Sequence, residues 1–526
     1  MSNPRTPYHG VKWNEPIIYE LSRHGRPGFK VPDAEAGVKK SVGDASSDIP
    51  ASMRRRRPPK LPELSEPEVV RHFVRLSQET FGVDSGINVG VGTCTMKYNP
   101  KINESLARSP KLQCLHPLQP EDTVQGVLQI IYAMGKWLCE ISGMDECSMQ
   151  PRAGAHAIFT NMLLARAYHR SMGEADQRDE VVTTVLSHPS NGGAPAMAGY
   201  KVIALYPDEE TGSPTIEAVK AAVSKHTAAL AITDPYDTGI FDPNLREYIR
   251  IVHEAGGLVA VDQANANGML GRLRVGELGA DMCQFNLHKT FSVPHASAGP
   301  GSAPVCVKDH LARFLPVPQV GFDGRRYHLD YNRPDTIGKV SGFYGVVPNV
   351  VRAYAWILSM GADGIREASE VAVLNNNYLT KKLLAVRGVT LPWNGGGGRR
   401  LQETRFSLKR MKDDTGIGIA EVNRRIVDFG LQRCFTSHEP LLIPEPFTPE
   451  PTETASRDDL DRFADAFQQM SEEAYSDPEV LKTAPHWATI SAIDHGVSTN
   501  PKEWALTWRA YLRKKSPTRS GKRTRG

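Results

Sequence analysis

Residues 258–265 read LVAVDQAN, and residues 282–291 read MCQFNLHKTF. Each stretch opens with a short apolar run of the kind that forms a buried strand. Asp262 comes directly after the first run, and Lys289 lies four residues after the second. In an open parallel sheet, the loops at the carboxyl ends of the strands carry the chemistry. The two stretches therefore predict a site that contains Asp262 and Lys289.

Short apolar runs alternate with helical segments around these stretches. Three further strands are expected at Val181–Leu186, Lys201–Leu205 and Ala228–Thr233, and helices at Thr215–Ser224 and Asn244–Ala255. Strands that alternate with helices are typical of a mostly parallel sheet with helices on both faces. The predicted fold class is therefore α/β.

Composition divides the chain of 526 residues into four expected parts. Nine prolines exclude long helices from residues 1–62, which are expected to form an extended N-terminal arm. Residues 63–349 are expected to form the large α/β domain, and residues 350–505 a smaller C-terminal α+β domain, with long helices at 350–360 and 364–385. The basic residues 506–526 are expected to form a disordered tail.

Charge and cysteine content exclude several classes of function. The 63 basic residues exceed the 59 acidic ones by 4, and seven of the basic residues lie within 513–526, so nucleic acid is not an expected partner. No apolar run approaches the length of a membrane span. Seven cysteines without a CxxC pair predict neither a metal site nor a disulfide framework. The N-terminal residues lack an apolar signal segment, so a cytoplasmic location is expected.

A lysine and an aspartate at neighbouring strand ends fit a site for pyridoxal phosphate (PLP). The aldehyde of PLP needs an amine such as Lys289, and its pyridine nitrogen needs a carboxylate such as Asp262 to stay protonated. Ala264 would point to the same side as Asp262 and pack on the ring. Exposed Asp and Lys residues account for most pairs of this kind, so the pair alone leaves a purely structural alternative open.

A third stretch adds a place for the phosphate group. Residues 152–156 read RAGAH and precede an apolar helix at Ile158–Tyr168. Small residues at a helix N-terminus let backbone N–H groups bind a phosphate. His156 would then stack on the ring, and His288 could reach the phosphate. A helix cap or a core position is the alternative for His156, and a core position is the alternative for His288.

Several longer stretches resemble one known family. TCTMKYNPKINE (93–104), LHPLQPEDTVQG (115–126), AGAHAIFT (153–160), NLHKTFSVPH (286–295) and EPTETASRDDLD (450–461) closely resemble glycine dehydrogenase (decarboxylating), the PLP-dependent protein of the glycine cleavage system. The chain is most similar to subunit 2 of the two-subunit form. The resemblance implies a PLP-dependent transferase-like fold of type I, with a large domain and a smaller C-terminal one.

The resemblance also implies roles for individual residues. Lys289 would bind PLP covalently and act in catalysis, and His188 would carry protons near the substrate. The other residues implied to bind the cofactor are Gly154, Ala155, His156, Thr233, Asp262, Ala264 and His288. The residues implied to contact substrate are Thr93, Cys94, Thr95 and Asn191.

The implied activity is PLP-dependent decarboxylation of glycine, an oxidoreductase reaction of amino-acid catabolism, with transfer of the aminomethyl group to a lipoyl carrier protein. The implied partners are that carrier and subunit 1, in a hetero- or homo-oligomer, and no metal is implied. The segments 84–95 and 233–239 differ from the family pattern, and Asp234 would bring a negative charge where the family has an amide. Two alternatives therefore stay open: a PLP-dependent lyase or decarboxylase paralogue acting on another amino acid, and a non-catalytic partner subunit.

Overall fold

The computed structural model describes residues 9–515 except 27, 30, 45, 58, 83, 85, 88, 93–96, 295–300, 394, 492–495 and 497–498. The described chain forms two compact units. One holds Gly82–His486, and the other combines His9–Phe81 with the described residues from Trp487 onward. The boundaries predicted at residues 62, 349 and 505 do not coincide with this division and stay a prediction.

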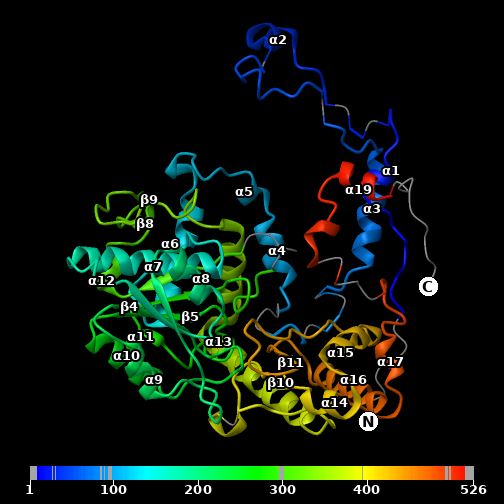
Figure 1. Ribbon diagram of the computed structural model, residues 1–526. Coiled ribbons are helices and arrows are strands. Elements are labelled where there is room, and N and C mark those ends of the chain that lie inside the picture. Colours follow the sequence, from blue (N-terminus) through cyan, green and yellow to red (C-terminus); the bar gives the residue numbers. More distant parts are fainter. Residues whose placement is uncertain are drawn as a thin grey trace. The chain divides into compact units, whose positions relative to one another are not determined.

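A seven-stranded sheet forms the centre of the larger unit (Figure 1), in the order β1-β7-β6-β5-β4-β2-β3. The five strands from β3 to β6 run parallel, while β7 is antiparallel to both β6 and β1. This arrangement confirms the predicted mostly parallel α/β sheet. The strands are β1 Glu146–Ser148, β2 Glu180–Thr184, β3 Lys201–Leu205, β4 Thr227–Thr233, β5 Leu258–Gln263, β6 Met282–Phe285 and β7 Val305–Val307.

Helices cover both faces of this sheet, which explains why its strands are continuous apolar runs. Val259 and Val261 of β5 belong to one core cluster, and Leu258 and Ala260 to another. Successive side chains of a strand point to opposite faces, so each face has its own core. The helices before residue 345 in this unit are α4 Lys101–Ala107, α5 Pro110–Gln113, η2 Glu121–Thr123, α6 Gln125–Ser142, α7 Gly154–Ser171, α8 Ser190–Met197, α9 Ile216–Ala222, α10 Leu245–Glu254, α11 Val275–Leu278 and α12 Asp309–Ala312.

A separate cluster of buried side chains gathers in the C-terminal part of the larger unit. Helix α13, Val347–Leu383, leads into it and is interrupted at Gly361, whose φ of 63° is left-handed. The left-handed backbone at Gly361 separates two helical segments that share the label α13, which agrees with the two helices predicted at 350–360 and 364–385. The remaining elements are η3 Gly395–Gly398, β10 Phe406–Ser407, α14 Lys409–Thr415, α15 Ile419–Arg425, η4 Ile426–Phe429, β11 Pro446–Phe447, α16 Arg457–Ser476 and α17 Glu479–Lys482. A two-stranded hairpin, β8 Gln319–Phe322 and β9 Tyr327–Asp330, precedes them.

The smaller unit contains only short elements before residue 66, as the prolines predict. Its helices are α1 Ile18–Leu21, α2 Ala36–Val42, α3 Glu66–Gln78, η5 Pro501–Glu503 and α19 Trp508–Lys515. Ser65 and Glu68 form the capping box of α3. Helix α19 corrects the expectation of a disordered tail for residues 508–515, because Trp508 stacks on Tyr19 with ring centroids 5.2 Å apart. Residues 516–526 lie outside the described part of the chain.

Among the described residues, no helix has the length and apolar character needed to cross a membrane.

Candidate functional site

Asp262 stands at the centre of the candidate site, one residue before the end of strand β5. The residue is 2% exposed. Its Oδ2 accepts from Asn191 Nδ2 at 2.8 Å and from Thr233 Oγ1 at 3.1 Å, and its Oδ1 accepts from the Ala264 N–H at 2.9 Å. Three donors hold the carboxylate in one orientation. Sequence reasoning named all four residues, and the structure brings them together.

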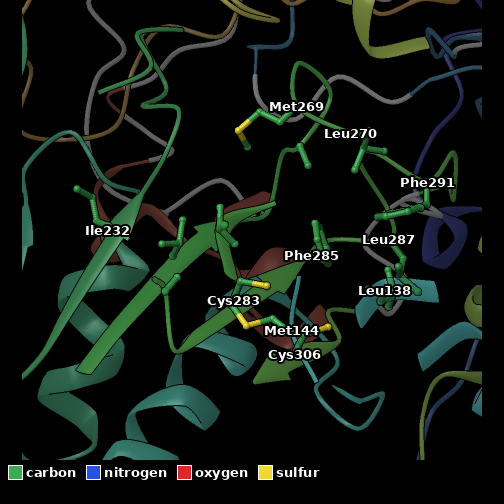
Figure 2. Close-up of a cluster of buried hydrophobic side chains, with 14 of the residues drawn as sticks. Leu138, Met144, Ile232, Met269, Leu270, Cys283, Phe285, Leu287, Phe291 and Cys306 are labelled. Atoms are coloured by element: carbon green, nitrogen blue, oxygen red, sulfur yellow. The ribbon is translucent and has the colours of Figure 1, made fainter. Parts of the chain in front are cut away.

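Lys289 follows β6 and is 7% exposed. Its backbone N–H donates to Asn286 O at 2.9 Å, which turns the chain directly after the strand. Figure 2 shows Phe285, Leu287 and Phe291 among the buried hydrophobic side chains of this region. These apolar side chains on both sides of Lys289 anchor the segment in the core. A buried amine on a rigid segment suits covalent attachment of an aldehyde.

His188 lies beside this pair, just before α8. Its backbone N–H donates to Thr233 Oγ1 at 3.1 Å, and its Nδ1 is 2.6 Å from Ser190 Oγ. Burial lowers the pKa of His188, although the charge of Asp262 opposes this effect. The imidazole is therefore neutral at physiological pH and can accept a proton.

A second histidine, His438, reaches the same place from the C-terminal part of the unit. The His188 and His438 rings meet edge to face with centroids 4.7 Å apart. Burial and the nearby His188 lower the pKa of His438. Sequence reasoning missed His438, because it lies in an irregular segment without a motif.

The first turn of α7 supplies the predicted place for a phosphate group. The helix has 18 residues. Its N-cap residue, Ala153, has no side-chain acceptor for the first backbone N–H groups. A Cβ at Gly154 would lie 3.0 Å from the amide atoms of Asn286, so glycine allows this close approach. Ala155 is exposed, which leaves the helix start accessible. Uncapped N–H groups at the start of a long helix favour an anion.

Two histidines flank this helix start. The His156 Nδ1 accepts from the Arg152 N–H at 3.3 Å, and burial lowers the pKa of His156. His288 Nδ1 accepts from the Ser302 N–H at 3.3 Å, and a Cβ at Gly301 would lie 2.8 Å from the His288 ring. Stacking of His156 on the cofactor and contact of His288 with its phosphate stay predictions.

Asp234 differs from its expected role. It is 1% exposed, and its Oδ1 accepts from the Asp242 N–H at 3.0 Å. Burial raises the pKa of Asp234 well above its ordinary value, which favours the neutral form of this carboxyl group over the charged one. Thr93, Cys94 and Thr95, the residues implied to contact substrate, lie outside the described residues.

Four further buried ionisable residues lie close to the site and were not among the predicted site residues. Arg405 forms an ion pair with Asp237, with Nη1 to Oδ1 at 3.0 Å and Nη2 to Oδ2 at 2.8 Å. Glu403 and Glu450 are both buried, and both are close enough to Lys289 for its charge to lower their pKa values. All except Asp237 come from the C-terminal part of the unit, so this part completes the site.

Comparisons with known proteins match two parts of the chain to family models and the fold to a solved structure. Residues 153–325 match the family model of class-V aminotransferases, and residues 368–486 match the C-terminal domain of glycine dehydrogenase. A solved structure of glycine decarboxylase (P-protein) of the glycine cleavage system, in inhibitor-bound form, has a TM-score of 0.69 and is 20% identical. It covers 84% of this chain and 99% of its own.

Two named relatives are similar to this chain over nearly their whole length. The protein named probable glycine dehydrogenase (decarboxylating) subunit 2 of Pyrococcus furiosus is 46% identical over 506 residues, which are 96% of this chain and 98% of the relative. The protein of the same name from Caldanaerobacter subterraneus is 42% identical, over 91% of this chain and 96% of the relative.

The fold and the site define a PLP-dependent enzyme, as the class-V aminotransferase match and the sequence both indicate. The buried lysine, the triply held carboxylate and the uncapped start of α7 fit the amine, the ring nitrogen and the phosphate that PLP requires. With relatives this similar over nearly the whole chain, the protein belongs to the family of glycine dehydrogenase (decarboxylating) subunit 2. The predicted family, fold class and cofactor are confirmed.

Proposed function

We propose that this chain decarboxylates glycine with PLP and passes the aminomethyl group to a lipoyl carrier protein. It would work with glycine dehydrogenase subunit 1, as the name "subunit 2" of its relatives suggests. The observation that carries the proposal is the buried pair of Lys289 and Asp262, with Asp262 held by three donors. Family membership adds glycine as the substrate.

Each residue has a part that follows from its position. Lys289 would hold the cofactor covalently, and Gly154 and Ala155 would bind its phosphate through backbone N–H groups. The Asp262 carboxylate would keep a proton on the ring nitrogen. PLP, when bound, supplies a ring that accepts the electron pair left behind when carbon dioxide departs.

The surroundings of His188 support a role in proton transfer. Its lowered pKa keeps the ring neutral, so its free nitrogen can accept a proton from the substrate amine and return it later. Asn191 lies within the same hydrogen-bonded group, because its Nδ2 also contacts Thr233 Oγ1 at 3.0 Å. Asn191 and Asp262 are buried and His188 and Thr233 are half-buried, which limits the access of water and strengthens the electrostatic interactions of the group.

Amino-acid selectivity tests the proposed substrate. Glycine lacks a side chain, so selection for it depends on excluding larger side chains. We expect glycine to produce a saturable change in the visible absorbance of the PLP-loaded chain, while alanine, serine and larger amino acids bind more than about tenfold more weakly. Spectrophotometric titration with each amino acid measures this. Tighter binding of a larger amino acid would instead favour the paralogue with a different substrate.

A further inference from the structure

Glu403 and Glu450 lie opposite each other in the interior of the larger unit. Strand β10 pairs with β11 antiparallel, and the pairing continues to Thr404, whose N–H donates to Pro449 O at 3.3 Å. The same register places Glu403 opposite Glu450. Glu403 is 1% exposed and Glu450 is 0% exposed. Two carboxyl groups are thus enclosed side by side, away from water.

Glu450 is fixed by the loop that follows Asp262. Its Oε1 accepts from Asn265 Nδ2 at 2.5 Å and from Asn267 Nδ2 at 2.7 Å. Between these two residues, the Ala266 N–H donates to Thr290 Oγ1 at 2.9 Å. Thr290 is the residue directly after the cofactor lysine. The carboxyl group of Glu450 is therefore tied to the segment that carries this lysine.

Each carboxyl group keeps one oxygen without a hydrogen-bond partner among the described residues. These atoms are Oε2 of Glu403 and Oε2 of Glu450. The other oxygen of Glu403 is 3.4 Å from Gln402 Nε2, a weak contact. A purely structural carboxylate in the interior would have its acceptors occupied. Each carboxyl group therefore has an acceptor available for a shared proton, and both groups lie within electrostatic range of Lys289.

Both carboxyl groups have raised pKa values in the folded chain. Burial raises the pKa of Glu450 to about 7 and raises the pKa of Glu403 well above its ordinary value. The charged groups that act on Glu403 are Glu450, Asp237, Arg405 and Lys289, and those that act on Glu450 include Lys289 and Lys97. Like charges this close cannot both ionise readily, so the pair titrates as a unit.

We propose that Glu403 and Glu450 share one proton and serve as the counter-charge and proton store for Lys289. This role rests on the proposed function, in which Lys289 alternates between binding the cofactor and carrying a free amine. When the amine is released, a carboxyl O–H bond breaks and an N–H bond forms at Lys289 Nζ. The proton returns when the lysine rebinds, and the total charge stays constant. Both glutamates are positioning residues that act through Lys289.

The test uses the full chain, freed of cofactor, and measures the thermal midpoint Tm against pH. A carboxyl group with a raised folded-state pKa stabilises the fold while protonated, and loses that contribution between its ordinary pKa of 4.5 and about 7. Glu450→Gln keeps an oxygen for both asparagines but cannot ionise. The difference in Tm, variant minus wild type, should therefore rise over this range and level off above it.

Lys289→Met supplies the decisive comparison. Because the lysine charge lowers the pKa of both glutamates, removing it should shift the rise in the Glu450→Gln difference to higher pH, by about one unit. The Tm difference between Glu403→Gln and wild type should shift to higher pH in the same way. Glu403→Gln is the second variant if Glu450→Gln does not fold. Glu445→Gln is the matched control: its carboxylate accepts from the Ile419 N–H at 2.8 Å, and its effect should not depend on Lys289.

Two results would overturn the proposal. The Tm difference between Glu450→Gln and wild type could stay constant with pH, or the midpoint of its rise could remain unchanged when Lys289→Met is added. The Tm measurement needs no substrate. If the Tm data show that the glutamates are coupled to Lys289 but the chain does not decarboxylate glycine, the coupling is supported and the proposed function is refuted.

Discussion

Replacement of Lys289 with alanine is expected to abolish covalent binding of PLP and to lower glycine turnover by a factor on the order of 10⁴, or roughly 5.4 kcal/mol of activation free energy. The residue is buried near Asp262 and His188 on a segment fixed by the core, so its amine has a defined position in the site. Borohydride reduction followed by peptide mass spectrometry gives the measurement. In the wild-type chain, the reduced cofactor should be found on the peptide containing NLHKTF.

Lys225→Ala is the matched control, because Lys225 is exposed and remote from β5 and β6 in sequence. This variant should keep the reducible cofactor and its full turnover. Reduced PLP on the corresponding peptide of Lys289→Ala (residues 286–291), or unchanged turnover of that variant, would show that the assignment of Lys289 is wrong.

Asp262→Asn should retain PLP and lose turnover by roughly 10²–10³-fold. Asparagine has nearly the same size, and its one oxygen can still accept from Asn191 and Thr233, so only the hydrogen bond from the Ala264 N–H is lost. It carries no charge, however, and so cannot hold a proton on the ring nitrogen. Visible absorbance measures cofactor content, and single-turnover release of carbon dioxide measures the chemistry.

Asp281→Asn provides the control for burial. Asp281 is a buried aspartate just before β6, paired with His253 at 2.9 Å and His310 at 3.2 Å. This variant should lower stability, because it removes the charge that pairs with two partly exposed histidines, but it should leave the turnover per folded molecule unchanged. Equal turnover in Asp262→Asn and wild type would refute the electrostatic role of Asp262.

Local signals were sufficient for the five parallel strands and for the core of the site. Asp262 directly follows an apolar run, Lys289 lies four residues after another, and Gly154 opens a long helix, so a few neighbouring residues define each position. The antiparallel strands β1 and β7 have three residues each, too few for a periodic pattern. They could not be placed without the pairing that the folded chain provides.

The parts of the site that the sequence did not predict share one property. Glu403, Arg405, His438 and Glu450 lie more than 100 residues after Lys289 and in short or irregular segments. Their place beside the lysine depends on how the C-terminal part packs against the sheet, as in the contact of Asn265 with Glu450. A pattern within one segment contains no information on such a contact. The raised pKa of Asp234 has the same origin, because burial is its main cause.

Exchange of labelled bicarbonate into glycine tests the central claim most directly. The full chain is combined with PLP, subunit 1 and a lipoyl carrier protein, and the label in the carboxyl group of glycine is measured over time. The proposed function predicts saturable exchange that requires every component and disappears in Lys289→Ala. Absence of exchange with all components present, together with loss of carbon dioxide from a larger amino acid, would contradict it.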